Sequence, residues 1–482
     1  MNYSIVTKLV GILLLFEAAF MLPAQFISIY YNQSDQSAFF ISILIIFVIG
    51  FSMTRVKTTN QKIKTKEGLA IVSLGWLFTS IFGALPFVLS GSLPSFVDAF
   101  FETVSGLTTT GASVVKDIEA LPMGILFWRS FTHWVGGMGI LVFTVAILPI
   151  FGVGGFQIFK AESPGPVADK VVPRIKDTAK ILYITYISIT IIEFILLLFG
   201  GMTWFDSALH TFGTVGTGGF STKNASIGAY DSTYIHLVIT IFMILSGANF
   251  SLYFAFYKGK WRDAIKNEEL RLYLTIILLA TVFIGANLYF TTYEASGLAF
   301  RDAFFQVGSL ITTTGYMTAD FDQWPTFSKS ILFLLFFIGG SAGSTSGGIK
   351  VIRILVLLKF VKREIKKIFH PRALIPIKIQ NKSISSDVSA SISSFFMLYL
   401  FLFIIGTILI SLEDIGLESA ASAVAATLGN IGPGFGVVGP TQNFSGFSDF
   451  SKIVFSILML FGRLELFTII ALIVPKSWRN ET

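Results

Sequence analysis

Residues 98–113 read DAFFETVSGLTTTGAS, and residues 302–317 read DAFFQVGSLITTTGYM. The DAFF and TTTG segments lie at the same spacing in both stretches, so the two are copies of one motif. Residues 206–221, DSALHTFGTVGTGGFS, and residues 418–436, ESAASAVAATLGNIGPGFG, follow the same plan, the last with one extra residue before its glycine. The chain therefore contains four repeats, and residues 1–60 lie outside them.

The composition requires a membrane around these repeats. Hydrophobic residues make up 53% of the 482 residues and charged residues 13%, and the mean hydropathy is +0.75. An ordinary globular protein has about 25% charged residues. This composition excludes a disordered chain and a nucleic-acid-binding module, and the absence of cysteine excludes disulfides and thiolate metal sites. A bilayer is crossed by roughly 20 apolar residues. We expect ten spans: 5–30, 37–53, 68–90, 123–150, 178–203, 233–257, 271–293, 328–358, 388–411 and 450–474.

Shorter apolar stretches lie between these spans, near 95–107, 203–215, 299–311 and 417–429. Each has about half the length needed to cross, which predicts a re-entrant pore helix. An acidic residue stands near the start of each, where a carboxylate can cap a helix or face its positive end. The expected N-caps are Asp98, Asp206, Asp302 and Glu418.

The sequence thus predicts an all-α polytopic membrane protein. Each repeat is a first span, a pore helix and a second span, and the repeats surround one pore with fourfold pseudo-symmetry. An extra N-terminal helix pair adds to them. The expected units are residues 1–60 for the helix pair and 61–160, 161–260, 261–365 and 366–482 for the four pore repeats.

The glycine-centred turn after each pore helix has a chemical use. A chain that leaves a helix at mid-membrane is tolerated only inside protein or beside water. Its carbonyls can replace the hydration shell of an ion, and the negative C-terminal ends of the pore helices favour a cation. A single TTTG would be a helix-end turn, whereas four copies favour a pore. Carbonyl rings without carboxylates favour a large monovalent cation such as potassium over a divalent one.

Basic residues cluster in segments 54–66, 258–271 and 359–382. Lysine and arginine gather in cytoplasmic loops, so the formal charge of +7 is explained by membrane orientation and not by nucleic acid. With ten spans, both termini are then cytoplasmic.

The eighth expected span contains a glycine- and serine-rich segment, residues 339–348. A glycine costs about 1 kcal/mol relative to alanine in a helix, so this segment predicts a broken helix, although a close-packing face is the alternative. No strand precedes it and no P-loop ending follows, so we expect no nucleotide site on this chain. Arg463 lies deep in the last span, where an ionisable residue indicates function. Carbonyls freed by the broken helix are its expected acceptors.

The chain resembles the Trk/Ktr/HKT superfamily of potassium uptake proteins, most closely its bacterial TrkH type. The resemblance covers the whole chain and is carried by these segments: SGLTTTGAS at 105–113, TGGFSTKNAS at 217–226, ITTTGY at 311–316, GNIGPGFG at 429–436, FGRLEL at 461–466 and FHPRALIPIKI at 369–379. It implies a homodimer in the bacterial cell membrane. It also implies a cytosolic regulatory subunit of the TrkA type that binds a nucleotide.

The resemblance also implies site residues. Four glycines and the two residues before each would form a potassium-selective filter: Thr109, Thr110 and Gly111; Thr217, Gly218 and Gly219; Thr313, Thr314 and Gly315; Asn430, Ile431 and Gly432. The broken helix would be an intramembrane gate beside Arg463, with Gly339, Gly340, Ser341, Gly343, Ser344, Gly347 and Gly348.

Potassium uptake through this filter is the function predicted. A secondary transporter that couples sodium or protons to the movement of a solute or potassium is the rival, because broken helices with glycine also mark such proteins. Four parallel repeats favour the pore over two inverted halves. No catalytic motif is present, and His133 and His210 are expected to be structural, so we do not expect an enzyme.

Overall fold

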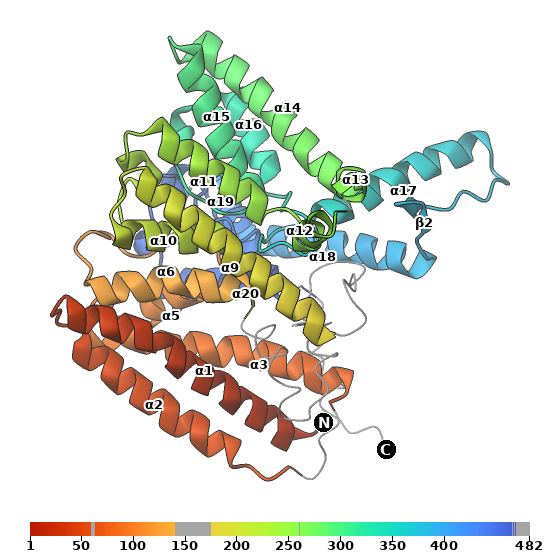
Figure 1. Cartoon of the computed structure of the whole chain (residues 1–482). Helices are drawn as coiled ribbons and strands as arrows, with labels where there is room; N and C mark the ends of the chain where they lie inside the picture. Colours follow the sequence, from red (N-terminus) through yellow and green to blue (C-terminus); the bar gives the residue numbers. More distant parts are fainter. Residues whose placement is uncertain (59–62, 140–174, 260, 465, 467, 469–482) are drawn as a thin grey trace.

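The structure is a computed structural model, and it describes residues 1–58, 63–139, 175–259, 261–464, 466 and 468. The regular secondary structure of this part of the chain is helical except for one short hairpin of two antiparallel strands, β1 and β2. The first two helices, α1 (Tyr3–Tyr30) and α2 (Gln36–Thr54), pack along each other outside the repeats (Figure 1). The buried Asp35 between them accepts hydrogen bonds from the Ser28 hydroxyl and from the backbone N–H of Ile125, 3.0 Å away. The N-terminal pair is therefore fixed to the first repeat.

The four repeats follow in chain order. Repeat 1 contains α3 (Thr65–Gly83), α4 (Leu85–Leu89), the pore helix α5 (Phe96–Leu107) and α6 (Met123–Gly137). Repeat 2 contains α9 (Ile175–Phe199), the pore helix α10 (Trp204–Val215), α11 (Thr233–Ser246), α12 (Phe250–Tyr257) and α13 (Trp261–Ile265). Repeat 3 contains α14 (Glu268–Thr291), the pore helix α15 (Ser296–Ile311), α16 (Thr326–Leu335) and α17 (Val351–Phe369). Repeat 4 contains β1 (Lys378–Ile379), β2 (Lys382–Ser383), α18 (Ser386–Ile410), the pore helix α19 (Leu417–Leu428) and α20 (Asp449–Arg463). Short 3₁₀ helices lie at Ser226–Ala229, Phe321–Gln323, Ser411–Glu413, Gly436–Val438 and Phe444–Gly446.

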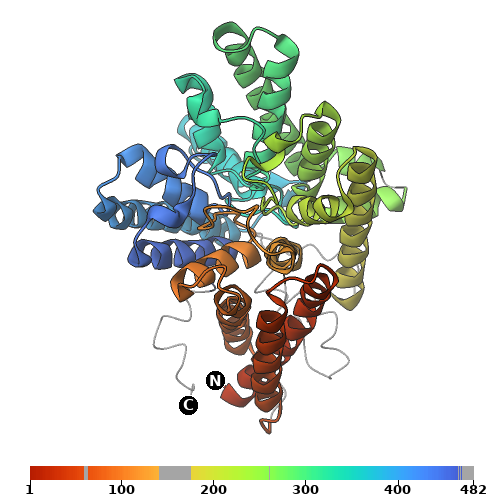
Figure 2. The same cartoon turned by 90° about the vertical axis from the view of Figure 1, so that its left-hand side faces the viewer.

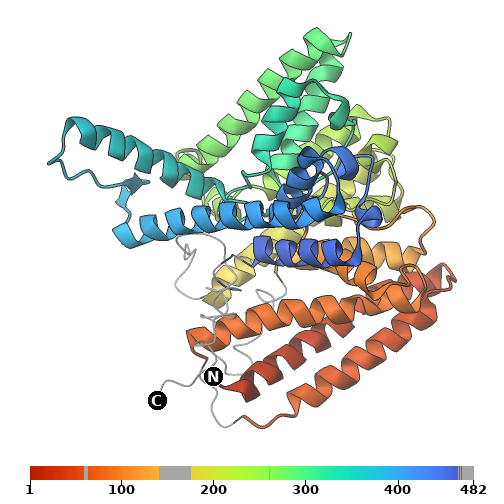
Figure 3. The same ribbon diagram turned by 180° about the vertical axis from the view of Figure 1, so that it is seen from behind.

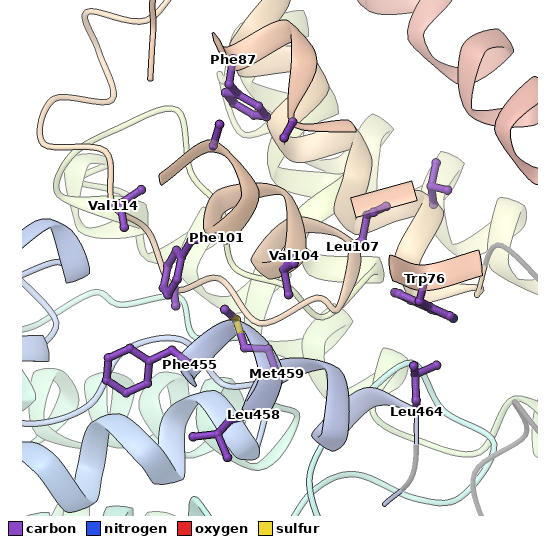
Figure 4. Close-up of a cluster of buried hydrophobic side chains, with 14 of the residues drawn as sticks. Trp76, Phe87, Phe101, Val104, Leu107, Val114, Phe455, Leu458, Met459 and Leu464 are labelled. Carbon is purple, nitrogen blue, oxygen red and sulfur yellow. The ribbon is translucent and has the colours of Figure 1, made fainter. Parts of the chain in front are cut away.

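The repeats surround a common centre. In Figure 2 their colours follow one another around it, from orange through yellow-green and teal to blue, and the red N-terminal pair lies outside. Helices α6, α11 and α20 each contact the pore helix of the next repeat, namely α10, α15 and α5. The contact of α20 with α5 joins the last repeat to the first and closes the ring. Figure 4 shows Phe455 and Met459 of α20 beside Phe101 and Val104 of α5 in this contact. The predicted fourfold arrangement with an extra helix pair is confirmed.

Six helices of the described chain are long and apolar enough to span a bilayer, or seven if one bent pair counts as a span. The bent pair corrects the predicted span 233–257, because α11 and α12 meet at 93° across residues 247–249. Asn249 explains the break: its side chain accepts a hydrogen bond from the N–H of Ser251 and starts a new helix. The predicted break in span 328–358 is confirmed. Spans 123–150 and 450–474, and the unit boundary at 160/161, extend outside the described residues.

The predicted N-caps are wrong. Ser95 caps α5 and Thr203 caps α10, each accepting a hydrogen bond from the N–H three residues on, at Asp98 and Asp206. A short hydroxyl side chain reaches that N–H more easily than a carboxylate placed one turn later. Glu418 follows the N-cap residue Gly416, and Asp302 lies in the second turn of α15, which begins at Ser296. The acids at 98, 206 and 418 thus lie in the first turn of their helices, where the helix dipole favours them.

Candidate functional site

All four pore helices end in the same turn. The residue two positions before each motif glycine has a positive φ, 55° at Thr109, Thr217 and Thr313 and 53° at Asn430. A positive φ is uncommon for residues with a side chain, so a common geometry is imposed on all four repeats. The motif glycines have φ values of 82°, 79°, 81° and 98° at Gly111, Gly219, Gly315 and Gly432.

The backbone between these positions is fixed in the same way each time. The N–H of the middle residue donates to a carbonyl five residues back in its pore helix, at 2.9 Å from Thr110 to Ser105 and 2.8 Å from Thr314 to Ser309. The equivalent bonds from Gly218 and Ile431 are also 2.8 Å long. This hydrogen bond satisfies a carbonyl that the helix end leaves without a partner.

The four turns are in contact with one another. A Cβ built on Gly111 would lie 2.1 Å from the Gly218 oxygen, and one on Gly219 would lie 1.9 Å from the Thr314 oxygen. The series continues with 2.0 Å from Gly315 to the Ile431 oxygen and closes with 2.7 Å from Gly432 to the Thr110 oxygen. Each carbonyl just before a motif glycine therefore lies against the glycine of the preceding repeat. The structure brings all twelve predicted filter residues into one ring, and a side chain at any of the four glycines would collide with it.

One cavity opens on this ring. It has a volume of about 160 Å³, and all four motif glycines line it. Arg129 and Ser221 lie in its wall. An ion that enters the cavity meets the four glycines together, as expected at the mouth of a pore.

Glu102 and Arg129 form a buried ion pair at this mouth, and neither residue was predicted from the sequence. The Glu102 carboxylate accepts hydrogen bonds from the Ser113 hydroxyl and the Val114 N–H, each at 2.9 Å, and from Arg129 Nε at 2.6 Å. Arg129 also donates to the Ser221 oxygen of repeat 2 at 3.1 Å. The ion pair is almost completely buried, with side chains 0% and 2% exposed. The rule that marked Arg463, an arginine within an apolar span, applies equally to Arg129 and was the available signal.

The histidines have structural partners. His210 Nδ1 donates to the Asp206 oxygen at 2.8 Å, so its Nε2 accepts from the Ser221 hydroxyl at 2.9 Å. His133 Nδ1 donates to the Gly106 oxygen at 2.7 Å. Within the described residues no group of three or more histidine, aspartate or glutamate side chains could hold a metal ion. These bonds support the structural roles expected for both residues.

The predicted gate segment forms a loop between α16 and α17. Its ends are joined by hydrogen bonds from the Gly339 N–H to the Ile349 oxygen, 2.9 Å, and from the Val351 N–H to the Gly340 oxygen, 3.1 Å. The loop contacts repeat 2 through the N–H of Ser341, which donates to the Gly247 oxygen at 2.8 Å. Within the loop, Ser344 N–H donates to the Ser341 oxygen. Gly343 and Gly348 have φ values of 74° and 66°, a conformation that breaks a helix.

The same loop lies against the filter turns. The Gly347 N–H donates to Thr313 Oγ1 at 2.7 Å, and a Cβ on Gly347 would lie 2.7 Å from the Gly429 oxygen. The Thr345 hydroxyl donates to the Val215 oxygen at the end of α10, 3.1 Å away. One short segment thus contacts the pore-helix ends of three repeats.

Arg463 supplies the link to the remaining repeat. Its Nη1 donates to the Thr345 oxygen of the loop at 2.6 Å, which confirms the predicted acceptor. Its Nη2 donates to the Gly136 and Gly137 oxygens at the end of α6, at 2.5 and 3.1 Å. The guanidinium therefore connects the loop to repeats 1 and 4.

Residues 35–480 match the family model TrkH, described as a cation transport protein. The chain belongs to this family. It is 40% identical to the Trk system potassium uptake protein TrkH of Escherichia coli K12 and 36% identical to the TrkG protein of the same strain. These alignments cover 100% and 99% of both chains. The crystal structure of the potassium transporter TrkH from Vibrio parahaemolyticus aligns with a TM-score of 0.89 at 37% identity, over 99% of this chain and 100% of the other.

Membership of the TrkH family confirms the predicted resemblance and makes the chain a multi-pass membrane protein of cation transport. It also confirms that the chain is not an enzyme, because the family is one of transporters. The ring of four turns and the loop in contact with it are the candidate functional parts of this chain.

Proposed function

We propose that this chain conducts potassium into the cell through the ring formed by the four filter turns. The observation that carries the proposal is the closed series of contacts between each motif glycine and a carbonyl of the next repeat. Such carbonyls replace the water around a weakly hydrated monovalent cation, and potassium is the ion in the printed names of the relatives. In this proposal Thr109 to Gly111 and their counterparts in the other repeats are the ion site.

The gate is the loop 339–348 with Arg463. Support comes from the hydrogen bond of the Gly347 N–H to Thr313 and from the bond between Arg463 and the Thr345 oxygen. A segment with these contacts blocks the ring until it moves, so the gate controls how often ions pass and the ring controls which ions pass.

The orientation, dimer and partner belong to the same proposal. The basic segments 54–66, 258–271 and 359–382 favour a cytoplasmic side in a bacterial cell membrane, with both termini on that side. Helix α17 and the β1–β2 hairpin project from the repeats and offer a surface for a cytosolic TrkA-type subunit (Figures 1 and 3). That subunit would bind the nucleotide, and two copies of this chain would form a dimer. Deleting the neighbouring TrkA-type protein should change transport; unchanged transport, with no cytosolic protein co-purifying, would remove the partner.

Rubidium flux into liposomes that contain the purified chain tests the conduction. We expect rubidium to enter down its own gradient in the absence of any proton or sodium gradient. Flux that appears only with an imposed proton or sodium gradient would favour the secondary transporter, for which the broken second helices are the supporting observation.

A further inference from the structure

Two adjacent glutamates begin helix α14, and the second contacts the gate loop. Glu269 is 5% exposed, and its Oε1 accepts hydrogen bonds from the N–H groups of Ala342, at 2.7 Å, and Ile352, at 3.2 Å. Ala342 lies in the loop and Ile352 in the first turn of α17. A single carboxylate oxygen therefore joins the two ends of the segment 343–351.

The two hydrogen bonds of Glu269 are strong because of where they lie, at the interruption between α16 and α17. The interruption between α16 and α17 leaves backbone N–H groups without helical partners, and the first turn of α17 adds its own unpaired donors. A carboxylate there is favoured by the helix dipole, and hydrogen bonds to a charged acceptor are about twice as strong as neutral ones. Glu269 thus satisfies donors that would otherwise be buried without a partner.

The carboxylate is held in a fixed frame. Asn267 caps α14 by accepting a hydrogen bond from the Leu270 N–H at 2.9 Å. Glu268 pairs with Lys359 of α17 and accepts from the Gln380 N–H of the hairpin at 3.0 Å. The start of α14 is therefore tied to α17 and to the hairpin, so Glu269 cannot follow the loop if the loop moves.

We propose that Glu269 is a positioning residue that clamps the gate loop closed from α14, in addition to the hold that Arg463 exerts from α20. The inference rests on the proposed function for the meaning of the loop as a gate. The clamp itself is a statement about loop position, and it can be measured without any ion. Opening then requires that the bonds to Ala342 and Ile352 break.

The chain has no cysteine, so a single introduced thiol reports on the loop. Ser346 is 2% exposed, and Ser346→Cys changes one atom of a buried side chain. In liposomes we would measure how fast a charged methanethiosulfonate reagent modifies this thiol, alone and together with Glu269→Ala. Loss of two hydrogen bonds to a charged group should accelerate modification at least about tenfold. Glu364→Ala is the matched control, because it removes an exposed acid of α17 that pairs with Arg363 at 2.8 Å and should leave the rate unchanged.

Glu269→Gln keeps the acceptor and the shape but removes the charge, so it should give an intermediate acceleration and serves if Glu269→Ala does not fold. An unchanged rate in both folded variants, or in the glutamine variant when only it folds, overturns the clamp. Rubidium flux in the same liposomes separates the two proposals. Faster modification without rubidium conduction in any variant supports the clamp and contradicts the proposed function, whereas conduction with unchanged modification contradicts the clamp alone.

Discussion

Repeats 1 and 3 carry nearly the same motif and build the same turn. Thr109 and Thr313 share a φ of 55°, and the glycines that follow have φ values of 82° at Gly111 and 81° at Gly315. Behind the turn the two repeats differ. In repeat 1 the fifth residue of the motif is Glu102, which pairs with Arg129, whereas in repeat 3 the same position is Gln306.

Gln306 is fully buried, and within the described residues neither of its polar side-chain atoms has a hydrogen-bond partner. Gly137 and Gly340 lie at corresponding depth in the second spans of repeats 1 and 3. Counted back eight residues from each, the equivalent of Arg129 is Leu332, which is also buried. The turn in repeat 3 is held instead by Ser309, whose hydroxyl donates to the Tyr316 oxygen at 2.6 Å. The comparison shows that the turn is set by the motif backbone, while each repeat braces it with different side chains.

Glu102→Gln gives repeat 1 the residue of repeat 3 and should have the largest effect. It leaves Arg129 as a buried cation without its carboxylate, and breaking a buried pair costs about 3–5 kcal/mol. We expect a lower melting temperature and less folded protein, measured by fluorescence-detected size exclusion after heating. Flux should fall in proportion to the folded fraction.

The double variant Glu102→Gln with Arg129→Leu completes the exchange and is the informative control. The second change removes the buried cation that the first leaves without its carboxylate, so more than half of the lost stability should return. If the double variant is as unstable as the single one, the hydrogen bond from Arg129 to Ser221, and not the neutralisation of the Arg129 charge, stabilises this part of the structure.

Gly315→Ser tests the part that the two repeats share. A Cβ at this position would lie 2.0 Å from the Ile431 oxygen, and φ is unfavourable for a side chain, so the carbonyl ring must shift. We expect the permeability ratio of potassium to sodium to fall about tenfold, a loss of about 1.4 kcal/mol of discrimination. Reversal potentials in mixed solutions measure it. Gly432→Ser should change the ratio less, because its Cβ would lie 2.7 Å from the nearest carbonyl; an unchanged ratio in folded Gly315→Ser removes this glycine from the filter.

The parts that the sequence could predict are those that repeat. Four copies of one motif located the four glycines of the ring, the family resemblance added the two residues before each, and an arginine in an apolar span pointed to acceptors in the broken helix. The partners behind the turn could not be predicted, because Glu102, Arg129 and Ser221 lie on three separate segments of the chain and meet only when these pack together. The bend at 247–249 was missed for another reason: the apolar run is continuous, and only Gly247 and Asn249 mark the break.

Arg463→Ala tests another difference between repeats 1 and 3. The second helix of repeat 3 is interrupted by the loop 339–348, whereas the end of the second helix of repeat 1 supplies carbonyls to Arg463. The change removes the bond to the Thr345 oxygen. Net hydrogen-bond energies of about 1 kcal/mol predict a three- to tenfold rise in rubidium flux per folded protein, with selectivity unchanged. A loss of flux that matches the loss of folded protein would instead make Arg463 a brace of the fold.

The smallest effects are expected for Lys329→Gln and Lys452→Gln, which remove ion pairs near the starts of the pore helices. Lys452 of repeat 4 pairs with Asp98 of repeat 1 at 2.6 Å, with 7% of its side chain exposed. Lys329 of repeat 3 lies 3.7 Å from Asp322 and 3.5 Å from Glu418 of repeat 4, with 25% exposed.

Because solvent screens the longer and more exposed pairs, Lys329→Gln should cost at most about 0.5 kcal/mol, and Lys452→Gln closer to 1 kcal/mol. Thermal unfolding in low and high salt measures both, and salt should weaken the contribution of Lys329 more than that of Lys452. If the two variants lose equal stability at every salt concentration, the outer ion pairs of the repeats are equivalent, and the asymmetry between repeats 1 and 3 is confined to the braces behind the filter.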